Sequence, residues 1–230
     1  MQKDTRQKVR PPNTKRPENK RHGAIALLEF KTIASGILAS DLMLKRSPVA
    51  LLRCGTIHPG RFLILVGGSV ASTEEAYAAG AQLGKAEGSL DDSVFLGDVH
   101  PFLHDAVLGI RRDLAGDALA VVETYSSPAL LTAVDAAVKS TTVTLAEVRL
   151  GDDLGGHALA LMSGDLTNVE TALDICADRA GKQLLARTLL PRLDPGLRSL
   201  LDLGTRFGQC PAFEPAGAEY PEEAACSWDE

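Results

Sequence analysis

The sequence predicts an α+β fold built from two tandem copies of a ferredoxin-like, split β-α-β sandwich. The middle of the chain contains an internal repeat of two copies, and each copy has the same β-α-β-β-α-β order of segments. The 230 residues, 45% of them hydrophobic, suffice for two small cores. Aromatic residues are only 4% of the chain, so Ala, Leu and Val must provide most of the packing.

The two copies align in register over long stretches. Residues 24–53 align with residues 118–148 at one constant spacing, which places Lys45 on Lys139. After a slightly longer loop in the second copy, Gly68 aligns with Gly164. We therefore predict four parts, namely a basic tail (1–22), a first domain (23–115), a second domain (116–208) and an acidic tail (209–230).

Within each copy, β-branched and Leu-rich runs predict strands, and apolar residues at helical spacing predict helices. In the first helix these apolar residues are Ile33, Ile37, Leu38, Leu42 and Leu44. The predicted strands are Ala24–Phe30, Val49–Arg53 and Phe62–Val66 in the first copy, and Ala118–Thr124, Val143–Arg149 and Ala158–Met162 in the second. The next helix is expected to be capped by Ser72 or Thr73, and its counterpart by Thr167 or Asn168.

Composition excludes several classes of protein. Both tails are charged and poor in apolar residues, so we expect them to be flexible, and a solvated basic tail is favoured over nucleic-acid binding. No apolar run is long enough to span a membrane, and residues 1–22 do not resemble a signal peptide, so a cytoplasmic protein is expected. The cysteines are scattered, which argues against disulfides and closed zinc sites: Cys54, Cys176, Cys210 and Cys226. Cys54 and Cys176 are expected to be small buried residues.

No arrangement of residues indicates an enzyme. The sequence has no nucleophile elbow, P-loop or dinucleotide-binding glycine pattern. His100 and His104 lie at helical spacing beside Asp105, but the second copy has no matching histidines, so a surface helix start is expected rather than a metal site. Glu29 and Glu123 occupy equivalent strand positions, where a carboxylate is more consistent with subunit contacts than with acid–base chemistry.

The repeated stretches resemble the bacterial microcompartment (BMC) shell proteins, specifically the tandem-domain, trimer-forming type. The resemblance covers residues 23–204 and is carried by "LLEFKTIASGILASDLMLK", "VVETYSSPALLTAVDAAVK", "LVGGSV" and "LMSGDL". The pattern at Thr56–Phe62 is similar to that of trimeric shell proteins from propanediol-utilisation microcompartments.

The resemblance implies a structural role in a shell. Three chains would form a pseudohexameric trimer, which would pack edge to edge with other shell proteins around encapsulated enzymes. The residues Asp41, Lys45, Asp135 and Lys139 match the motif that forms contacts at the tile edge in the family. An ordinary solvated helix end is the alternative for these positions.

The resemblance also implies a central pore for small-molecule metabolites. The loops expected to line it are Ile57, His58, Pro59 and Gly60 in the first copy, and Asp152, Asp153, Leu154, Gly155 and Gly156 in the second. His58 would then occur three times around one axis and give a polar, weakly basic constriction.

Two alternatives remain for this histidine, and two for the protein. The ring could bind a metal or an iron–sulfur cluster at the three-fold pore, although similar family members place a cysteine in this loop and this chain has His58. It could also have no specific role. A ligand-binding sensor of the same fold, or less favourably an enzyme, would be the alternative to a shell tile.

Overall fold

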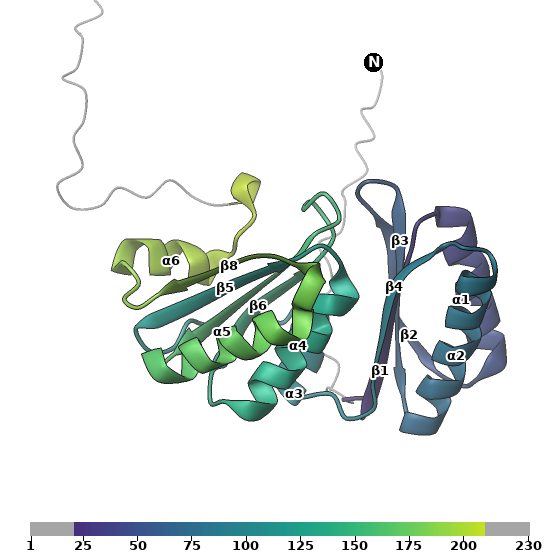
Figure 1. Cartoon of the computed structure of the whole chain (residues 1–230), viewed down its shortest axis with the longest axis horizontal. Coiled ribbons are helices and arrows are strands. Elements are labelled where there is room, and N and C mark those ends of the chain that lie inside the picture. Colours follow the sequence, from purple (N-terminus) through teal and green to yellow (C-terminus); the bar gives the residue numbers. More distant parts are fainter. Residues whose placement is uncertain (1–20, 210–230) are drawn as a thin grey trace, which may run out of the picture.

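The computed structural model describes residues 21–209, in which each copy forms a four-stranded antiparallel sheet with two helices on one face (Figure 1). The first half contains β1 (Ala24–Phe30), α1 (Ile33–Arg46), β2 (Ala50–Ile57), β3 (Arg61–Gly68), α2 (Val70–Ala86), β4 (Leu90–Leu96) and α3 (Pro101–Val107). The second half contains β5 (Ala118–Thr124), α4 (Ser127–Ser140), β6 (Thr144–Leu150), β7 (Ala158–Gly164), α5 (Leu166–Ala180), β8 (Leu184–Leu190) and α6 (Pro195–Leu203). Short 3-10 turns follow at Gly181–Gln183 and Phe207–Gln209.

Both sheets have the same strand order, β2-β3-β1-β4 and β6-β7-β5-β8, which confirms the predicted α+β sandwich and its repetition. The register also repeats, because Ala24 pairs with Gly68 in the first sheet and Ala118 pairs with Gly164 in the second. Strands β1 and β5 have the predicted bounds, whereas β2 continues beyond Arg53 to Ile57.

The predicted caps of the second helix in each half are wrong by a few residues. Ser69 precedes α2 and accepts a hydrogen bond from the Ser72 amide, and Asp165 occupies the equivalent position before α5. The helices begin earlier than expected because each third strand ends directly at its glycine, so the next residue already has the extended backbone of an N-cap.

The first sheet is covered on both faces, and every residue of β1 is buried. Its front face packs against α1 and α2 through side chains such as Leu28, Phe30 and Ile64. Its back face, which includes Leu27 and Leu65, is continuous with the core of the second half. In Figure 1 the second half accordingly lies against the face of the sheet opposite to α1 and α2.

Helix α3 lies between the two sheets, and this position corrects the prediction of a surface helix. His100 does cap the start of α3, but His104 and Asp105 are buried, with relative exposures of 2% and 3%. The reason is tertiary, since α3 packs against β6 of the other half. The buried Asp105 carboxylate accepts hydrogen bonds from Arg112 and from Arg21. Arg21 belongs to the segment that the sequence predicts to be a flexible tail.

Two remaining expectations concern cysteines and membranes. Cys176 is buried as predicted, whereas Cys54 is exposed because β2 is an edge strand with one neighbouring strand. Cys210, Cys226 and most of both predicted tails lie outside the described residues. Within residues 21–209, no helix combines the length and apolar character needed to cross a bilayer.

The Asp105 network predicts a measurable acid sensitivity. Burial raises the pKa of Asp105, but the hydrogen bonds from Arg21 and Arg112 outweigh burial and leave the pKa below its ordinary value. Asp105→Asn should lower the free energy of unfolding at pH 7 by about 3 kcal/mol, because it removes one member of a buried ionic cluster. Urea unfolding followed by circular dichroism measures this loss.

The pH dependence separates this charge effect from a packing effect. A carboxylate with a lowered pKa in the folded state stabilises the protein above its unfolded pKa, and this stabilisation disappears as the pH falls through the folded value. The wild type and Asp105→Asn should therefore converge in stability on acidification, while the exposed control Asp178→Asn stays near wild type throughout. An equal deficit at every pH would contradict the ionic explanation.

Candidate functional site: the paired loops and the junction between the halves

The loop between β2 and β3 is a tight turn. It contains a cis peptide bond between His58 and Pro59, and Gly60 has a φ of 90° and donates its amide to the Ile57 carbonyl over 3.0 Å. His58 is exposed at the tip of this turn. The turn therefore presents an imidazole on a short and closely defined backbone.

The loop between β6 and β7 is longer and glycine-rich. The Gly151 amide donates to the His157 carbonyl over 3.0 Å, and the His157 amide donates to the Leu154 carbonyl over 3.1 Å. Asp153 has a φ of 60°, an uncommon conformation for a residue with a side chain. The loop folds back on itself and holds both of its aspartates at the surface.

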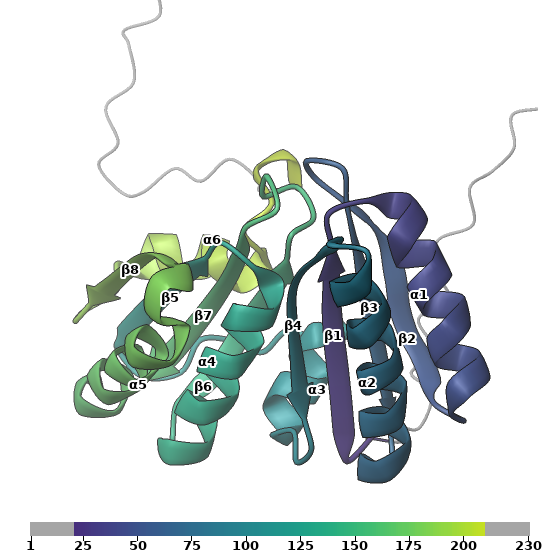
Figure 2. The ribbon, with the colours of Figure 1, turned by 45° about the vertical axis from the view of Figure 1, so that its right-hand side comes forward.

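The structure brings these two loops together. A Cβ atom added to Gly156 would lie 2.6 Å from the His58 carbonyl oxygen, and one added to Gly151 would lie 2.5 Å from Ile57 Cδ1. Figures 1 and 2 show the two loops side by side at one end of the molecule. The two loops expected to line a pore therefore lie together in a single chain, where His58, Asp152 and Asp153 are exposed, whereas Ile57 and Gly156 are buried. The pore itself stays a prediction.

Arginines hold the acidic loop. Arg206, which follows α6, forms an ion pair with Asp153 and lies 3.8 Å from Asp152. Arg149 on β6 donates to the Asp152 backbone carbonyl over 3.4 Å. Sequence analysis missed Arg206 because its partners lie more than 50 residues earlier in the chain and no local pattern joins them.

Glu29 lies at the junction between the two halves, and its carboxylate is completely buried. One oxygen accepts a hydrogen bond from Arg61 over 2.6 Å, and the other accepts from the Ser127 amide at the start of α4 over 3.0 Å. Burial raises the pKa of Glu29, and the Arg61 hydrogen bond opposes that rise. The carboxylate thus links the first sheet to a helix of the second half, where it interacts favourably with the positive end of the helix dipole.

The residues expected at the tile edge have two different environments. Asp41 and Lys45 form an exposed ion pair of 2.6 Å on α1. Asp135 and Lys139 form the equivalent pair on α4, but Asp135 is buried, and it accepts the His100 amide over 2.9 Å. Asp135 therefore stabilises the junction between the halves, and the edge role of all four residues remains a prediction.

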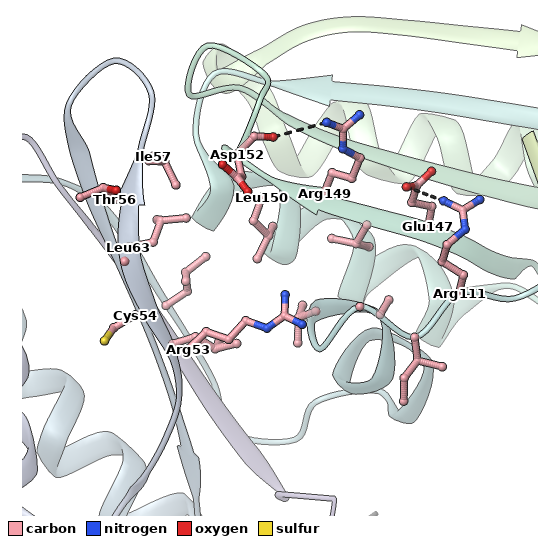
Figure 3. Close-up of a pocket in the computed structure, with 18 of the residues that line it drawn as sticks. Arg53, Cys54, Thr56, Ile57, Leu63, Arg111, Glu147, Arg149, Leu150 and Asp152 are labelled. Atoms are coloured by element: carbon pink, nitrogen blue, oxygen red, sulfur yellow. Dashed lines mark hydrogen bonds and ion pairs between the residues drawn. The ribbon is translucent and has the colours of Figure 1, made fainter. Parts of the chain in front are cut away.

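A cavity of about 330 Å³ lies at the same junction, beside the paired loops (Figure 3). One wall consists of β2 and the back face of the first sheet, and the other consists of β6 and the end of α3. Arg53 extends from β2 into this space, whereas the Cys54 sulfur lies on the opposite side of the strand. Arg111 and Glu147 form an ion pair along the far wall.

The described residues do not fit an iron–sulfur cluster. Residues 57–60 contain no cysteine, and the one thiol of β2 projects away from the cavity between the halves. Thiolates are the usual ligands of such clusters. Across residues 21–209 no group of three or more His, Cys, Asp or Glu side chains is placed to hold a metal ion. Coordination by His58 would therefore require equivalent histidines from other chains.

Comparison with known proteins identifies the family. The BMC domain model matches residues 24–98 and 118–193, which correspond to the two halves of the structure. The chain belongs to the BMC-domain family of microcompartment shell proteins. This family is structural rather than enzymatic, which agrees with the expectation from sequence.

Individual relatives support this assignment. The BMC chain is 37% identical over 171 residues to the bacterial microcompartment shell protein PduT of Citrobacter freundii, covering 74% of this chain and 92% of the relative. It is 28% identical over 198 residues to the carboxysome assembly protein CcmO of Synechocystis sp. The alignment covers 79% of this chain and 65% of the relative. A crystal structure of a microcompartment protein from Desulfitobacterium hafniense DCB matches with a TM-score of 0.68 and 31% identity. The match covers 76% of this chain and 98% of that one.

The contact between the loops can be tested with two neighbouring glycines. Gly155 and Gly156 both have positive φ, 63° and 87°, but an added Cβ would approach the His58 carbonyl only at position 156. Gly155→Ala should cost about 1 kcal/mol of backbone strain. Gly156→Ala should cost more, because the new methyl group must displace the neighbouring turn.

Urea unfolding of both variants measures the difference, and the backbone amide signals of residues 57–61 report on movement of the turn. Gly155→Ala is the matched control, since it carries the strain without the clash. Equal stability of the two variants, with unchanged signals in the turn, would show that the loops do not touch.

Proposed function

We propose that three chains close into a pseudohexagonal tile of a microcompartment shell, with a central pore formed by the loops at residues 57–60 and 152–156. The observation that carries this proposal is that α1 leaves exposed the surface that α4, its counterpart in the repeat, buries between the halves. A second copy of the chain has the chemistry to cover that surface. Three repetitions of one junction then give a closed ring of six similar units.

The exposed surface of α1 carries large apolar side chains at three positions whose counterparts on α4 are buried. On α1, three large side chains are 39%, 56% and 43% exposed: Ile33, Ile37 and Leu44. Their counterparts on α4 are at most 5% exposed: Ser127, Leu131 and Val138. Burial of such side chains contributes about 25 cal/mol per Å² of apolar surface, which favours association of the chains.

Two carboxylates of the junction are also repeated. Glu123 on β5 corresponds to Glu29, which accepts the first amide of α4. In a ring, the Glu123 carboxylate would accept a hydrogen bond from the backbone amide of Ile33, at the start of α1 in the next chain. Asp41 would likewise be buried at the contact between chains, as Asp135 is at the junction within one chain. The Lys45 and Lys139 ammonium groups would lie closer to the outer edge, since 73% and 36% of their side chains are exposed.

Helix α6 provides a second apolar surface for the same contact. Within the chain α3 packs against β6, so the equivalent α6 would approach β2 of the next chain. None of the α6 residues is buried in the single chain, and Leu197 and Leu203 are 42% and 65% exposed. Leu51 on β2 is 38% exposed and would contribute to the facing surface.

The same ring would gather the paired loops around its axis. Three copies of His58, together with Asp152 and Asp153, would give a polar constriction with both basic and acidic groups. Arg206 reduces the negative charge of the aspartate loop. Passage of small metabolites would then depend on pore diameter and on these charges. Other shell proteins would contact the outer edge, and the enclosed enzymes would lie behind the tile.

Ile37→Asp should prevent the assembly of trimers, because it places a carboxylate in the apolar centre of the proposed contact. Analytical ultracentrifugation should give three times the chain mass for the wild type and the single-chain mass for the variant. Val70→Asp is the matched control, since Val70 is 49% exposed and its counterpart Leu166 remains exposed as well. A trimeric Ile37→Asp protein would contradict the proposed contact.

The alternative of a metal-binding tile is tested by His58→Ala. Anaerobic purification, absorbance spectra and metal analysis at matched trimer mass compare this variant with the wild type. A shell tile with a lining histidine should be metal-free in both proteins. About one metal ion per three chains in the wild type and none in the variant would instead establish His58 as a ligand at the three-fold axis.

A further inference from the structure

The contact proposed between chains has a histidine where the junction within the chain has an arginine. Within the chain, the buried Glu29 carboxylate accepts a hydrogen bond from Arg61, which also pairs with Asp91 over 3.0 Å. The internal repeat places His157 on Arg61. Arginine stays charged at every physiological pH, whereas an imidazole gains or loses its charge between about pH 5 and 8. The charge of the second contact therefore depends on the pH.

The register of the second sheet puts this histidine beside Glu123. Glu123 pairs with Leu159, and His157 lies two residues before Leu159. Diagonal neighbours of this kind share one face of a sheet and are within reach of long side chains. Arg61 has the same diagonal position relative to Glu29, and there the two charged groups meet over 2.6 Å. Both Glu123 and His157 are half-buried, so a neighbouring chain would cover a pair that water now reaches.

The junction within the chain shows what such covering does to a carboxylate. Helix α4 contacts β1 and β4, and Glu29 beneath it is 0% exposed. Burial raises the pKa of Glu29, and the hydrogen bond from Arg61 opposes that rise. By the repeat, α1 of the next chain would contact β5 and β8 and cover Glu123 in the same way. A covered carboxylate is stable only with a donor or a positive partner, and the protonated imidazole would be that partner.

Strand β8 makes the second contact less acidic than the first. Leu185 and Ala186 stand where the first half has Asp91 and Asp92. The imidazole of His157 would therefore face one carboxylate, and its protonation would decide whether the covered pair is neutral or negative. A net charge excluded from water is unfavourable, so the contact is stronger when the imidazole is protonated.

Other ionisable groups around the imidazole are directed elsewhere. The Tyr125 ring contacts it edge-on, with 5.6 Å between the ring centroids. Lys31 of the next chain would take the place of Tyr125, but its Nζ donates to the Gly88 carbonyl of its own half over 3.5 Å. Lys182, in the turn before β8, is exposed. The charged groups of the adjacent loop and of the segment after α6 bind one another: Arg149, Asp152, Asp153 and Arg206.

We propose that the contact between chains is sensitive to pH through Glu123 and His157, whereas Arg61 keeps the junction within the chain charged throughout. The inference rests on the proposed function, because the covered pair exists only in a ring. Each contact that forms favours the protonated imidazole, so assembly takes up about one proton per contact. Association is therefore strongest where the imidazole of the free chain is already protonated, and it weakens as the pH rises through the neutral range.

Fluorescence-detected sedimentation of the full-length protein, over a dilution series at about pH 6 and about pH 8.5, measures this effect. Association of the wild type should be about tenfold weaker per contact at the higher pH, and about a thousandfold weaker for three contacts together. Where dilution does not dissociate the trimer, exchange of subunits between two labelled populations gives the dissociation rate at each pH. Three protonated copies of His58 around the axis would repel one another and produce the opposite sign.

Three variants locate the effect. His157→Arg reproduces the pair of the first half, so trimers should form equally well at both pH values. In Glu123→Gln the amide oxygen still accepts from the Ile33 amide and needs no positive partner, so the pH dependence should also disappear. His22→Gln is the matched control, because it removes a half-buried imidazole before β1, at the opposite end of that strand from Glu29. It should keep the pH dependence of the wild type.

The outcomes distinguish this inference from the ring itself. Trimers of equal affinity and equal dissociation rate at both pH values would overturn the pH sensitivity and leave the ring intact. Stronger association at the higher pH would overturn it as well, and so would an unchanged pH dependence in both His157→Arg and Glu123→Gln. Single chains at every concentration and pH, in the wild type and in His157→Arg, would count against the ring and against this inference with it.

Discussion

The architecture depends on one constraint, which is that the two long helices of each half cover only one of the two apolar faces of its sheet. The front face of the first sheet is covered by α1 and α2, and its back face is covered by the second half of the chain. Exposed apolar surface is costly in water, so a single copy of this unit would be poorly soluble. Duplication within one chain covers the apolar surface at the junction between the halves. It leaves one apolar surface exposed at each end of the chain's two-domain unit.

The internal junction combines this apolar contact with buried charge. The buried Glu29 carboxylate joins β1, Arg61 and the first amide of α4, and Arg61 also pairs with Asp91 over 3.0 Å. In the second copy, His157 corresponds to Arg61, and the register places Ala186 opposite Glu123 where Asp92 stands opposite Glu29. The two junctions of a ring would share their geometry and differ in charge, which distinguishes contacts within a chain from contacts between chains.

Loops and cavity are consequences of the same packing. The halves meet so closely at one end that glycine is required where the second loop passes the first, as the 2.6 Å approach at position 156 shows. Farther along the junction, β2 and β6 diverge and enclose the arginine-lined space. Contact at the loops and the space beside them thus both follow from how the two halves pack.

The sequence by itself determined the repeated α+β fold, the bounds of β1 and β5, and the two loops at residues 57–60 and 152–156. Periodicity and self-alignment report local preferences, and these are set by neighbouring residues. Only the tertiary structure placed Asp105 in the interior, exposed Cys54, and joined Arg206 to the acidic loop. The same holds for the contrast between Ile37 and Leu131, which have the same place in the repeat. Their burial depends on which surface packs against each helix, and no local pattern contains that information.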